Sequence, residues 1–411
     1  MKILFTVAVM DAFHGSVMHV LELANFLAKK HEIYIITTYI NRKVRINLDA
    51  DIHIIEIDKI TEPMTFDLIW SYHFPLLGSL LRNEFVAKRI ICGSLSSFEE
   101  LETFPLFWKL CSALHCVSEE AALAHCKNYN IPLEKIRIME NVVPLNYTLF
   151  QKEALPKKPV NIAIVSNYAP KELTDLKQKL EPKIRITYYG GNRNIFITPE
   201  ILIKHDLIIT IGKTVQYALA LGIPVYNYGR FGGDGYITKA NFSFERTYNF
   251  SGRPNNRKLT PDKICEEIFS QYILVSKNAK DLQEIARKNF LVSNSLNRFL
   301  SDYESLPIFD FKALQSYHLY LSQCDSFTKY LCRCHHPRTK YTKKPFRVIF
   351  KLVRKFLALF TPPPPVEKSR AFVSPGIAAL ELTQIQMREI NSPEYIYTRL
   401  TNFFNFDHLI N

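Results

Sequence analysis

The sequence contains no apolar run long enough to cross a membrane. A transmembrane helix needs about 20 consecutive apolar residues, and no uninterrupted apolar stretch of this 411-residue chain reaches that length. The N-terminus, MKILFTVAVMDAFHG, starts like a secretion signal, but Asp11 and His14 follow and no small-residue cleavage site does. We therefore expect residues 2–9 to form a buried strand and the protein to stay in the cytoplasm.

The cysteines lack the spacing of a metal site. Five of the eight are scattered through apolar segments, as reduced core thiols are. The remaining three join two histidines in a CxCHH-type cluster: Cys324, Cys332, Cys334, His335 and His336. Structural zinc sites usually contain CxxC pairs, and the chain has no convincing DxD-type acidic motif. We therefore expect neither a metal nor a cofactor.

The chain also lacks a nucleic-acid-binding motif, although its net charge is +13 and its pI about 9.2. Nine of these net charges lie between Pro337 and Arg370, where Glu367 is the single acid. The rest of the chain is nearly balanced. This distribution predicts one basic surface segment and no nucleic-acid partner.

That basic segment includes an amphipathic stretch, KKPFRVIFKLVRKFLALF, at residues 343–360. Its apolar residues recur at helical spacing, and lysines and arginines lie on or beside the opposite face. Such a helix can lie on an anionic membrane surface, which would hold the protein at the inner face of the cell membrane. The alternative is a helix packed on the protein's own core with its basic face in water.

The length of the chain predicts two domains and a tail. Short apolar segments alternate with helical stretches, which favours parallel, doubly wound sheets. The expected strands are 2–9, 33–39, 52–57, 67–73, 89–94 and 113–118, then 160–166, 184–190, 207–211 and 223–225. The expected parts are a first domain at 1–150, a linker at 151–159, a second domain at 160–305 and a tail at 306–411.

The most informative segment is DLIITIGKTVQYALALGIPV at residues 206–225. A buried strand meets Gly212, Lys213 and Thr214, which turn the chain into a helix over 215–221. A glycine-led turn at a helix N-terminus presents backbone N–H groups and the positive end of the helix dipole. With the charge of Lys213, this arrangement suits a phosphate or diphosphate. The alternative is an ordinary βαβ turn with a surface lysine.

This segment resembles the donor site of GT-B glycosyltransferases, in particular retaining family 4. The matching residues are Gly212, Thr214, Ala218, Ala220, Gly222, Pro224 and Val225. The resemblance covers about residues 1–300 and implies two Rossmann-like domains facing a cleft. The family has two glutamates where this chain has Ile209 and Tyr217. We expect the Tyr217 phenol to lie against the nucleotide in place of the ribose-binding glutamate.

The resemblance implies transfer of a sugar from a nucleotide-diphosphate donor to a cell-surface glycan or lipid-linked acceptor, with retention. The alternative is a non-catalytic nucleotide-sugar-binding or scaffold protein derived from such an enzyme. By this resemblance the turn with Gly15 and Ser16 would face the donor or acceptor, and Lys171 would approach the diphosphate. Gly15 would let a ligand come close and Ser16 would cap the first helix.

A glycine-rich loop, FGGDGYITKANFSFERTYNFSGR at residues 231–253, is expected at the same edge. Gly233 belongs to its flexible turn, and Arg246 and Arg253 can pair with phosphate oxygens. Similar stretches occur in some bacterial polysaccharide glycosyltransferases, including the kind that build cell-surface glycans. The alternative is a surface loop with solvated arginines.

The candidate catalytic residues follow buried strands of the first domain. His73 stands at the carboxyl end of the strand at 67–73, where it would face the cleft, and a structural histidine is the alternative. The segment ICGSLSSFEELE at residues 91–102 brings hydroxyls and carboxylates that can bind a sugar, with Ser94 and Glu99 as candidates. The same residues would also suit a capped helix N-terminus.

Overall fold

The computed structural model describes residues 1–96, 99–181, 183–191 and 194–335. The predicted amphipathic helix at 343–360 lies outside the described residues, and so do the proline run after it and His336. Within the described part, no helix is long and apolar enough to cross a membrane.

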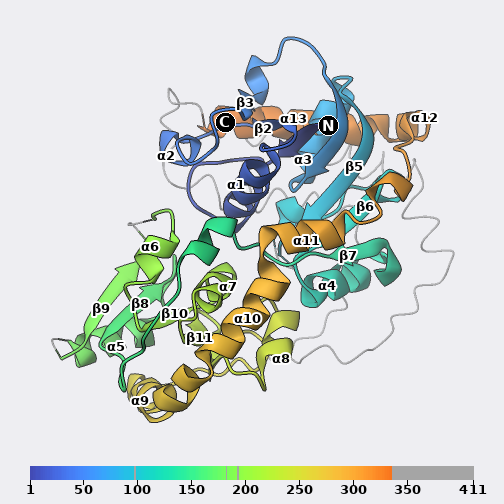
Figure 1. The fold of residues 1–411 in the computed structure, drawn as a ribbon. Helices are drawn as coiled ribbons and strands as arrows, with labels where there is room; N and C mark the ends of the chain where they lie inside the picture. The colour runs from blue at the N-terminus through green and yellow to red at the C-terminus, as the bar shows by residue number, and fades with distance from the viewer. Residues whose placement is uncertain (97–98, 182, 192–193, 336–411) are drawn as a thin grey trace, which may run out of the picture.

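The first domain is built on a seven-stranded parallel sheet with helices on both sides (Figure 1). Its strand order is β3-β2-β1-β4-β5-β6-β7. Strands are added outward from β1 first on one side and then, from β4 on, on the other, so the strand order reverses between β1 and β4. The strands are β1 Lys2–Thr6, β2 Glu32–Thr37, β3 His53–Glu56, β4 Thr65–Ser71, β5 Val86–Ser94, β6 Ala113–Cys116 and β7 Ile136–Ile138. The helices are α1 Gly15–Leu27, α2 Arg42–Arg45, α3 Phe74–Arg82 and α4 Glu119–Tyr129.

The second domain holds a five-stranded sheet in the order β12-β11-β10-β8-β9. All neighbours run parallel except β11 and β12. The strands are β8 Asn161–Val165, β9 Arg185–Tyr189, β10 Leu207–Thr210, β11 Val225–Gly229 and β12 Gly232–Tyr236. The helices are α5 Lys171–Leu180, α6 Pro199–Leu202, α7 Lys213–Ala220, α8 Phe242–Thr247, α9 Pro261–Lys277 and α10 Ala279–Phe290.

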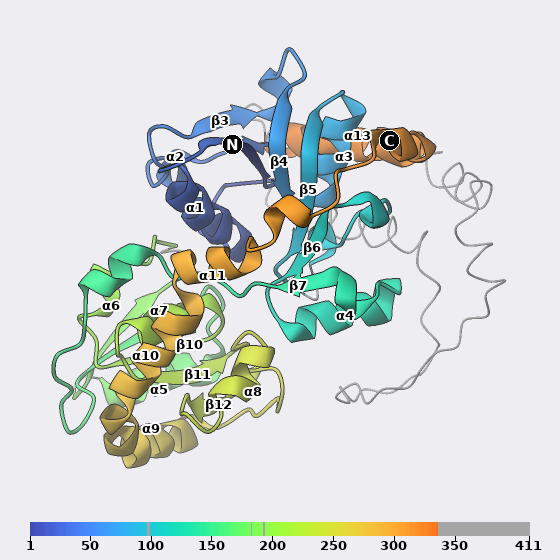
Figure 2. The same cartoon turned by 45° about the vertical axis from the view of Figure 1, so that its right-hand side comes forward.

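These two Rossmann-like sheets confirm the predicted GT-B fold. Every residue of β10 is buried because helices cover both faces of a parallel sheet. After α10 the chain returns to the first domain as α11, Val292–Phe299 (Figure 2). The N–H of Val143 donates to Phe290 O at 2.7 Å, so the first domain and α10 are also joined through the backbone.

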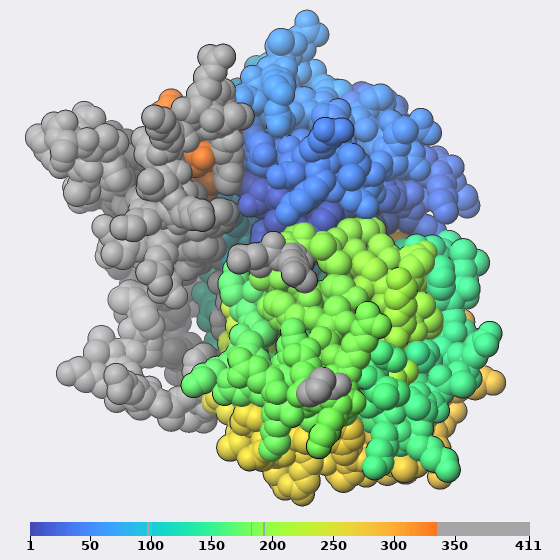
Figure 3. All heavy atoms as spheres, turned by 90° about the vertical axis from the view of Figure 1, so that its left-hand side faces the viewer, coloured from blue at the N-terminus to red at the C-terminus, as the bar shows by residue number. Residues whose placement is uncertain are grey.

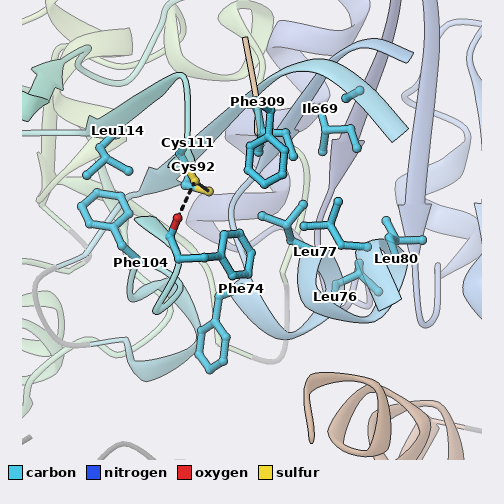
Figure 4. Packing of buried hydrophobic residues seen from close by; sticks show 14 of the residues in the cluster. Ile69, Phe74, Leu76, Leu77, Leu80, Cys92, Phe104, Cys111, Leu114 and Phe309 are labelled. Carbon is cyan, nitrogen blue, oxygen red and sulfur yellow. Dashed lines mark hydrogen bonds between the residues drawn. The ribbon is translucent and has the colours of Figure 1, made fainter. Parts of the chain in front are cut away.

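Residues 306–335 differ from the predicted appended tail. They form α12 (Phe311–Leu314) and α13 (His318–His335), and α13 packs along α3 of the first domain. Tyr320, Leu321 and Cys324 are buried in the same core cluster as residues of α3. Figure 4 shows that cluster, with Phe74, Leu76, Leu77 and Leu80 of α3 beside Phe309.

The close approach of α3 and α13 depends on Gly78. A Cβ atom at that position would lie 2.5 Å from Cys324 Cβ, which is far inside normal contact distance. The apolar residues of α13 are separated by polar residues in the sequence. Because its apolar side chains are buried against α3, the helix belongs to the first domain.

The segment at 231–253 also differs from the flexible loop that we expected. Gly232–Tyr236 is strand β12, which pairs antiparallel with β11, and α8 follows it. Gly233 is buried in this pairing, and a Cβ atom there would lie 1.9 Å from Asn227 O. The glycines here allow close backbone approach within the sheet.

Candidate functional site

Segments at the carboxyl ends of both sheets meet at the domain boundary. The loop after β1 reaches the second domain, where the N–H of Phe13 donates to Asn194 Oδ1 at 2.9 Å. Asn194 Nδ2 in turn donates to Asn167 Oδ1, in the loop after β8, at 3.2 Å. Figure 3 shows the two domains in contact at this boundary. Ligands of open α/β sheets bind outside the carboxyl ends of the strands, so the boundary is the candidate site.

The residues predicted in the first of these loops start α1. Gly15 is exposed, and no atom lies within 4 Å of the Cβ position there, so packing within the protein does not require a glycine at this place. The helix is capped by His14, without a side-chain hydrogen bond. We had predicted that Ser16 would cap α1; it instead lies half-buried in the first turn of the helix.

Gly212 is the N-cap of α7 and has a φ of 64°, in the positive-φ region that favours glycine. Its N–H donates to Phe250 O at 2.8 Å, so this group is already bonded inside the second domain. Lys213 and Thr214 form the first turn of α7 and are both half-buried. The predicted turn from strand to helix is therefore present, and Lys213 places a positively charged side chain in the first turn of α7.

Lys213 is paired with a glutamate that sequence reasoning missed. Its Nζ lies 2.5 Å from Glu22 Oε2 in α1 and donates to Val142 O at 3.3 Å. Burial lowers the pKa of Lys213, against the opposing effect of Glu22. Burial raises the pKa of Glu22 to about 7, although Lys213 and Tyr217 act in the opposite direction. Both ions therefore lose hydration at the boundary, and each depends on the other.

Tyr217 is inside this interface. Its hydroxyl donates to Glu22 Oε1, and its ring stacks on Tyr147 with centroids 4.8 Å apart. The side chain is 2% exposed. In this structure the phenol faces a carboxylate of the first domain and is covered, whereas we had expected it to lie against the nucleotide.

Arg246 and Arg253 are likewise paired across the boundary. Arg246 Nε donates to Glu140 Oε1 at 2.5 Å, and Glu140 follows β7. Arg253 forms a two-pronged pair with Glu120 in the first turn of α4, with Nε 2.8 Å from Oε1. The arginines thus pair with carboxylates of the first domain and are only partly exposed, whereas the surface-loop alternative has them fully in solvent.

Lys171 is the most open of the predicted cations. It is exposed and occupies the first position of α5, directly after Pro170. This end of the helix follows the loop that contains Asn167, so Lys171 lies near the domain boundary. Lys177 and Lys179 of the same helix form ion pairs, whereas none of the ion pairs among the described residues includes Lys171.

The candidate catalytic residues of the first domain are largely covered. His73 is 8% exposed; its Nδ1 accepts from the N–H of Ala8 at 2.7 Å, so Nε2 carries the proton of the neutral ring. That nitrogen lies 3.8 Å from Glu102 Oε1. His73 can therefore donate a hydrogen bond but cannot accept a proton at Nδ1 without losing its backbone partner.

Ser94 and Glu99 occupy opposite environments. Ser94 is fully buried, donates to Ser96 O at 3.0 Å and lies 2.9 Å from His125 Nε2. Its hydroxyl orders the loop after β5 and is closed to a substrate in this structure. Glu99 is exposed beside that loop. The loop is also held by Glu102, whose Oε2 accepts from the N–H of Leu95 at 2.7 Å.

His19 is a further boundary residue that the sequence did not reveal. It lies one helical turn before Glu22 on α1 and is fully buried. The Asn141 side chain acts on it as a hydrogen-bonding neighbour, but neither ring nitrogen has a partner at full hydrogen-bond geometry among the described residues. Burial, followed by the charge of Lys213, lowers its pKa well below the usual value. The ring is therefore neutral and retains one N–H for donation.

Among the described residues, no three histidines, cysteines, aspartates or glutamates are grouped to hold a metal ion. Cys324 is buried against α3, away from the domain boundary.

Comparisons with known proteins give similarity in structure only. No family model matches the chain, and no curated protein is recognisably related by sequence. HepE of Anabaena, solved with UDP and glucose, is 12% identical, with a TM-score of 0.48 over 74% of this chain and 100% of its own. A glycosyltransferase of Rickettsia africae is 16% identical, with a TM-score of 0.46 over 74% and 98%. WaaG, a glycosyltransferase involved in lipopolysaccharide biosynthesis, is 12% identical, with a TM-score of 0.43 over 73% and 99%.

Proposed function

We propose that this protein transfers a sugar from a nucleotide-diphosphate donor to a cell-surface glycan or lipid-linked acceptor, with retention of configuration. The observation that carries the proposal is the gathering of Lys213, Arg246 and Arg253 at the boundary where the carboxyl-end segments of two Rossmann-like sheets meet. Arginine and lysine are the residues that bind phosphate oxygens most strongly.

In this proposal the cations stabilise the departing diphosphate. The bond between the anomeric carbon and the diphosphate oxygen breaks, and the acceptor oxygen bonds to the same carbon. The acceptor proton passes to the departing donor phosphate, so no side chain has to serve as the base. His73 is suited to a hydrogen bond from Nε2 to a sugar hydroxyl, since Nδ1 is already bonded.

A second candidate is a nucleotide-sugar-binding protein without catalysis. The burial of Tyr217 favours it, because the position that carries a ribose-binding glutamate in the resembling family is filled by a covered phenol. The two functions share the donor site and differ in turnover, so hydrolysis or transfer of a bound nucleotide sugar separates them.

The test is a panel of UDP-, GDP-, ADP- and dTDP-sugars with the full-length protein. We expect one nucleotide class to raise the thermal unfolding temperature, because a ligand at 100 times its Kd adds about 2.7 kcal/mol of stability. Release of free nucleoside diphosphate in the presence of acceptor would then identify an enzyme. Absence of stabilisation by every member at millimolar concentration would overturn the proposed donor.

We further propose that residues 343–360 hold the protein on an anionic membrane, near a lipid-linked acceptor. Five of its basic side chains, each contributing about 1 kcal/mol close to the surface, are sufficient for reversible binding: Lys344, Arg347, Lys351, Arg354 and Lys355. We expect co-sedimentation with anionic vesicles at low salt, loss of binding in high salt, and loss on removal of residues 337–411. Equal binding to neutral vesicles, or binding that survives the truncation, would contradict this role.

A further inference from the structure

Three ion pairs at the domain boundary share one polarity. In each pair the cation belongs to the second domain and the carboxylate to the first. The pairs are Lys213–Glu22, Arg246–Glu140 and Arg253–Glu120. We call this set the carboxylate clasp.

The members of the clasp come from separate elements. The glutamates belong to α1, to the segment after β7 and to the first turn of α4, whereas the cations belong to α7, to α8 and to the segment after α8. No two members of a pair are neighbours in sequence; Arg246 and Glu140 are 106 residues apart, and Arg253 and Glu120 are 133. These pairs are therefore not the local i, i+4 pairs of a single helix. The tertiary fold brings the three carboxylates to the three cations.

Stability is a poor explanation for such an arrangement. The Glu22 side chain is 2% exposed and that of Lys213 is 11% exposed, so both ions have lost most of their hydration. A buried ion pair often contributes no more than apolar residues of similar volume would. The buried pair is therefore better explained by what the cations bind at another stage of the protein's cycle.

His19 supplies an independent sign that a ligand belongs here. Its two ring nitrogens lie inside the protein near Lys213, and neither has a partner at full hydrogen-bond geometry, although the Asn141 side chain lies close enough to act on the ring. Buried polar groups are normally hydrogen-bonded. A neutral imidazole next to a lysine can donate one hydrogen bond to an anionic oxygen, and in this structure no such oxygen reaches it.

We propose that Glu22, Glu120 and Glu140 occupy the cations of the donor-diphosphate site in the absence of donor, and so determine the affinity for it. Phosphate oxygens would replace the carboxylate oxygens one for one, and each glutamate would move out of its pair. Because every pair crosses the boundary, this exchange also loosens the contact between the domains. The inference rests on the proposed function and adds the groups that oppose donor binding.

Glu120 and Glu140 give the cleaner test because their arginine partners are more exposed, at 22% and 35%, than Lys213, the partner of Glu22, at 11%. The full-length wild type, Glu120→Gln, Glu140→Gln and the double variant are titrated calorimetrically with UDP, GDP, ADP and dTDP, and with the matching nucleosides. We expect each single variant to bind the preferred nucleoside diphosphate about three- to tenfold more tightly. Nucleoside affinity should not change.

Glu119→Gln is the matched control. Glu119 is the exposed neighbour of Glu120 in the same helical turn and belongs to none of the three pairs, so the substitution removes the same charge without freeing Arg253. Arg253→Gln should weaken diphosphate binding, because it removes the group that the carboxylate and the phosphate share.

The outcomes separate the two proposals. If wild type binds a nucleoside diphosphate but Glu120→Gln and Glu140→Gln bind it no more tightly than Glu119→Gln, the clasp is purely structural and the inference is overturned, while the proposed function stands. If neither wild type nor any variant binds one of the four diphosphates, both proposals fall.

Discussion

Lys213→Ala is expected to lower the free energy of unfolding by about 3–5 kcal/mol at pH 8, because it leaves the Glu22 carboxylate buried without its cation. Val142 O also loses its hydrogen-bond donor. Urea unfolding, followed by circular dichroism, measures this loss.

The control is Lys213→Met, alone and combined with Glu22→Gln. Methionine keeps most of the apolar stem of lysine, so its single variant isolates the effect of the charge. The double variant removes the orphaned carboxylate and should recover most of the lost stability. A double variant as unstable as Lys213→Met would show that packing of the stem, and not the ion pair, causes the loss.

The Lys213→Met substitution should also distinguish the contribution of Lys213 to diphosphate binding from any contribution to nucleoside binding. Loss of one charge-assisted contact costs about 1.5–3 kcal/mol, and a nucleoside has no group to make that contact. We therefore expect Lys213→Met, studied near pH 6 where Glu22 is protonated, to weaken diphosphate binding and leave nucleoside binding unchanged. Equal losses for both ligands would remove Lys213 from the donor site.

Most of the fold could be predicted because its strands are apolar runs between helical stretches. β10 at Leu207–Thr210 and the turn at Gly212 that precedes α7 follow directly from local sequence. β12 was missed because Gly232 and its neighbours have the composition of a turn, and only the antiparallel pairing with β11 makes them a strand. α13 was missed because its buried face becomes visible only against α3.

The cations of the candidate site could be predicted and their partners could not. Lys213 stands in a recognisable turn, whereas Glu22 lies between Leu21 and Leu23 on a helix whose core-facing residues are apolar. Nothing local distinguishes such a glutamate from one on a solvated face. Its role follows from the packing of α1 on α7, which brings together residues nearly two hundred positions apart.

The pH dependence of stability gives the sharpest test of the environment of Glu22. Burial raises the pKa of Glu22 from 4.5 to about 7 in the folded protein. Between these values the folded state holds a proton that the unfolded state has lost. The contribution of Glu22 to stability is therefore complete below pH 4.5 and is lost as the pH rises through 7.

Other buried groups act in the opposite direction and would hide this effect in wild type. Burial lowers the pKa of His115 and of His125 to about 4, so these residues reduce stability as the pH falls below 6.5. The groups that act on Glu22 are Lys213 and Tyr217 on α7, and Glu22 in turn acts on Tyr147; His19 lies one turn before Glu22 on the same helix. A comparison that changes Glu22 alone, with Lys213 already removed, cancels the histidines.

We therefore expect Lys213→Met and Glu22→Gln/Lys213→Met to diverge with pH. At pH 4.5 Glu22 is protonated in the folded state and resembles glutamine, so the two variants should unfold with similar free energies. By pH 7 the single variant should be less stable than the double by about 3 kcal/mol, since each pKa unit is worth about 1.4 kcal/mol. The gap should continue to widen above pH 7, because loss of Lys213 removes the charge that lowered the pKa of Glu22. A constant gap between pH 4.5 and 8 would show that this carboxylate titrates normally and reaches water, which would contradict its placement inside the domain boundary.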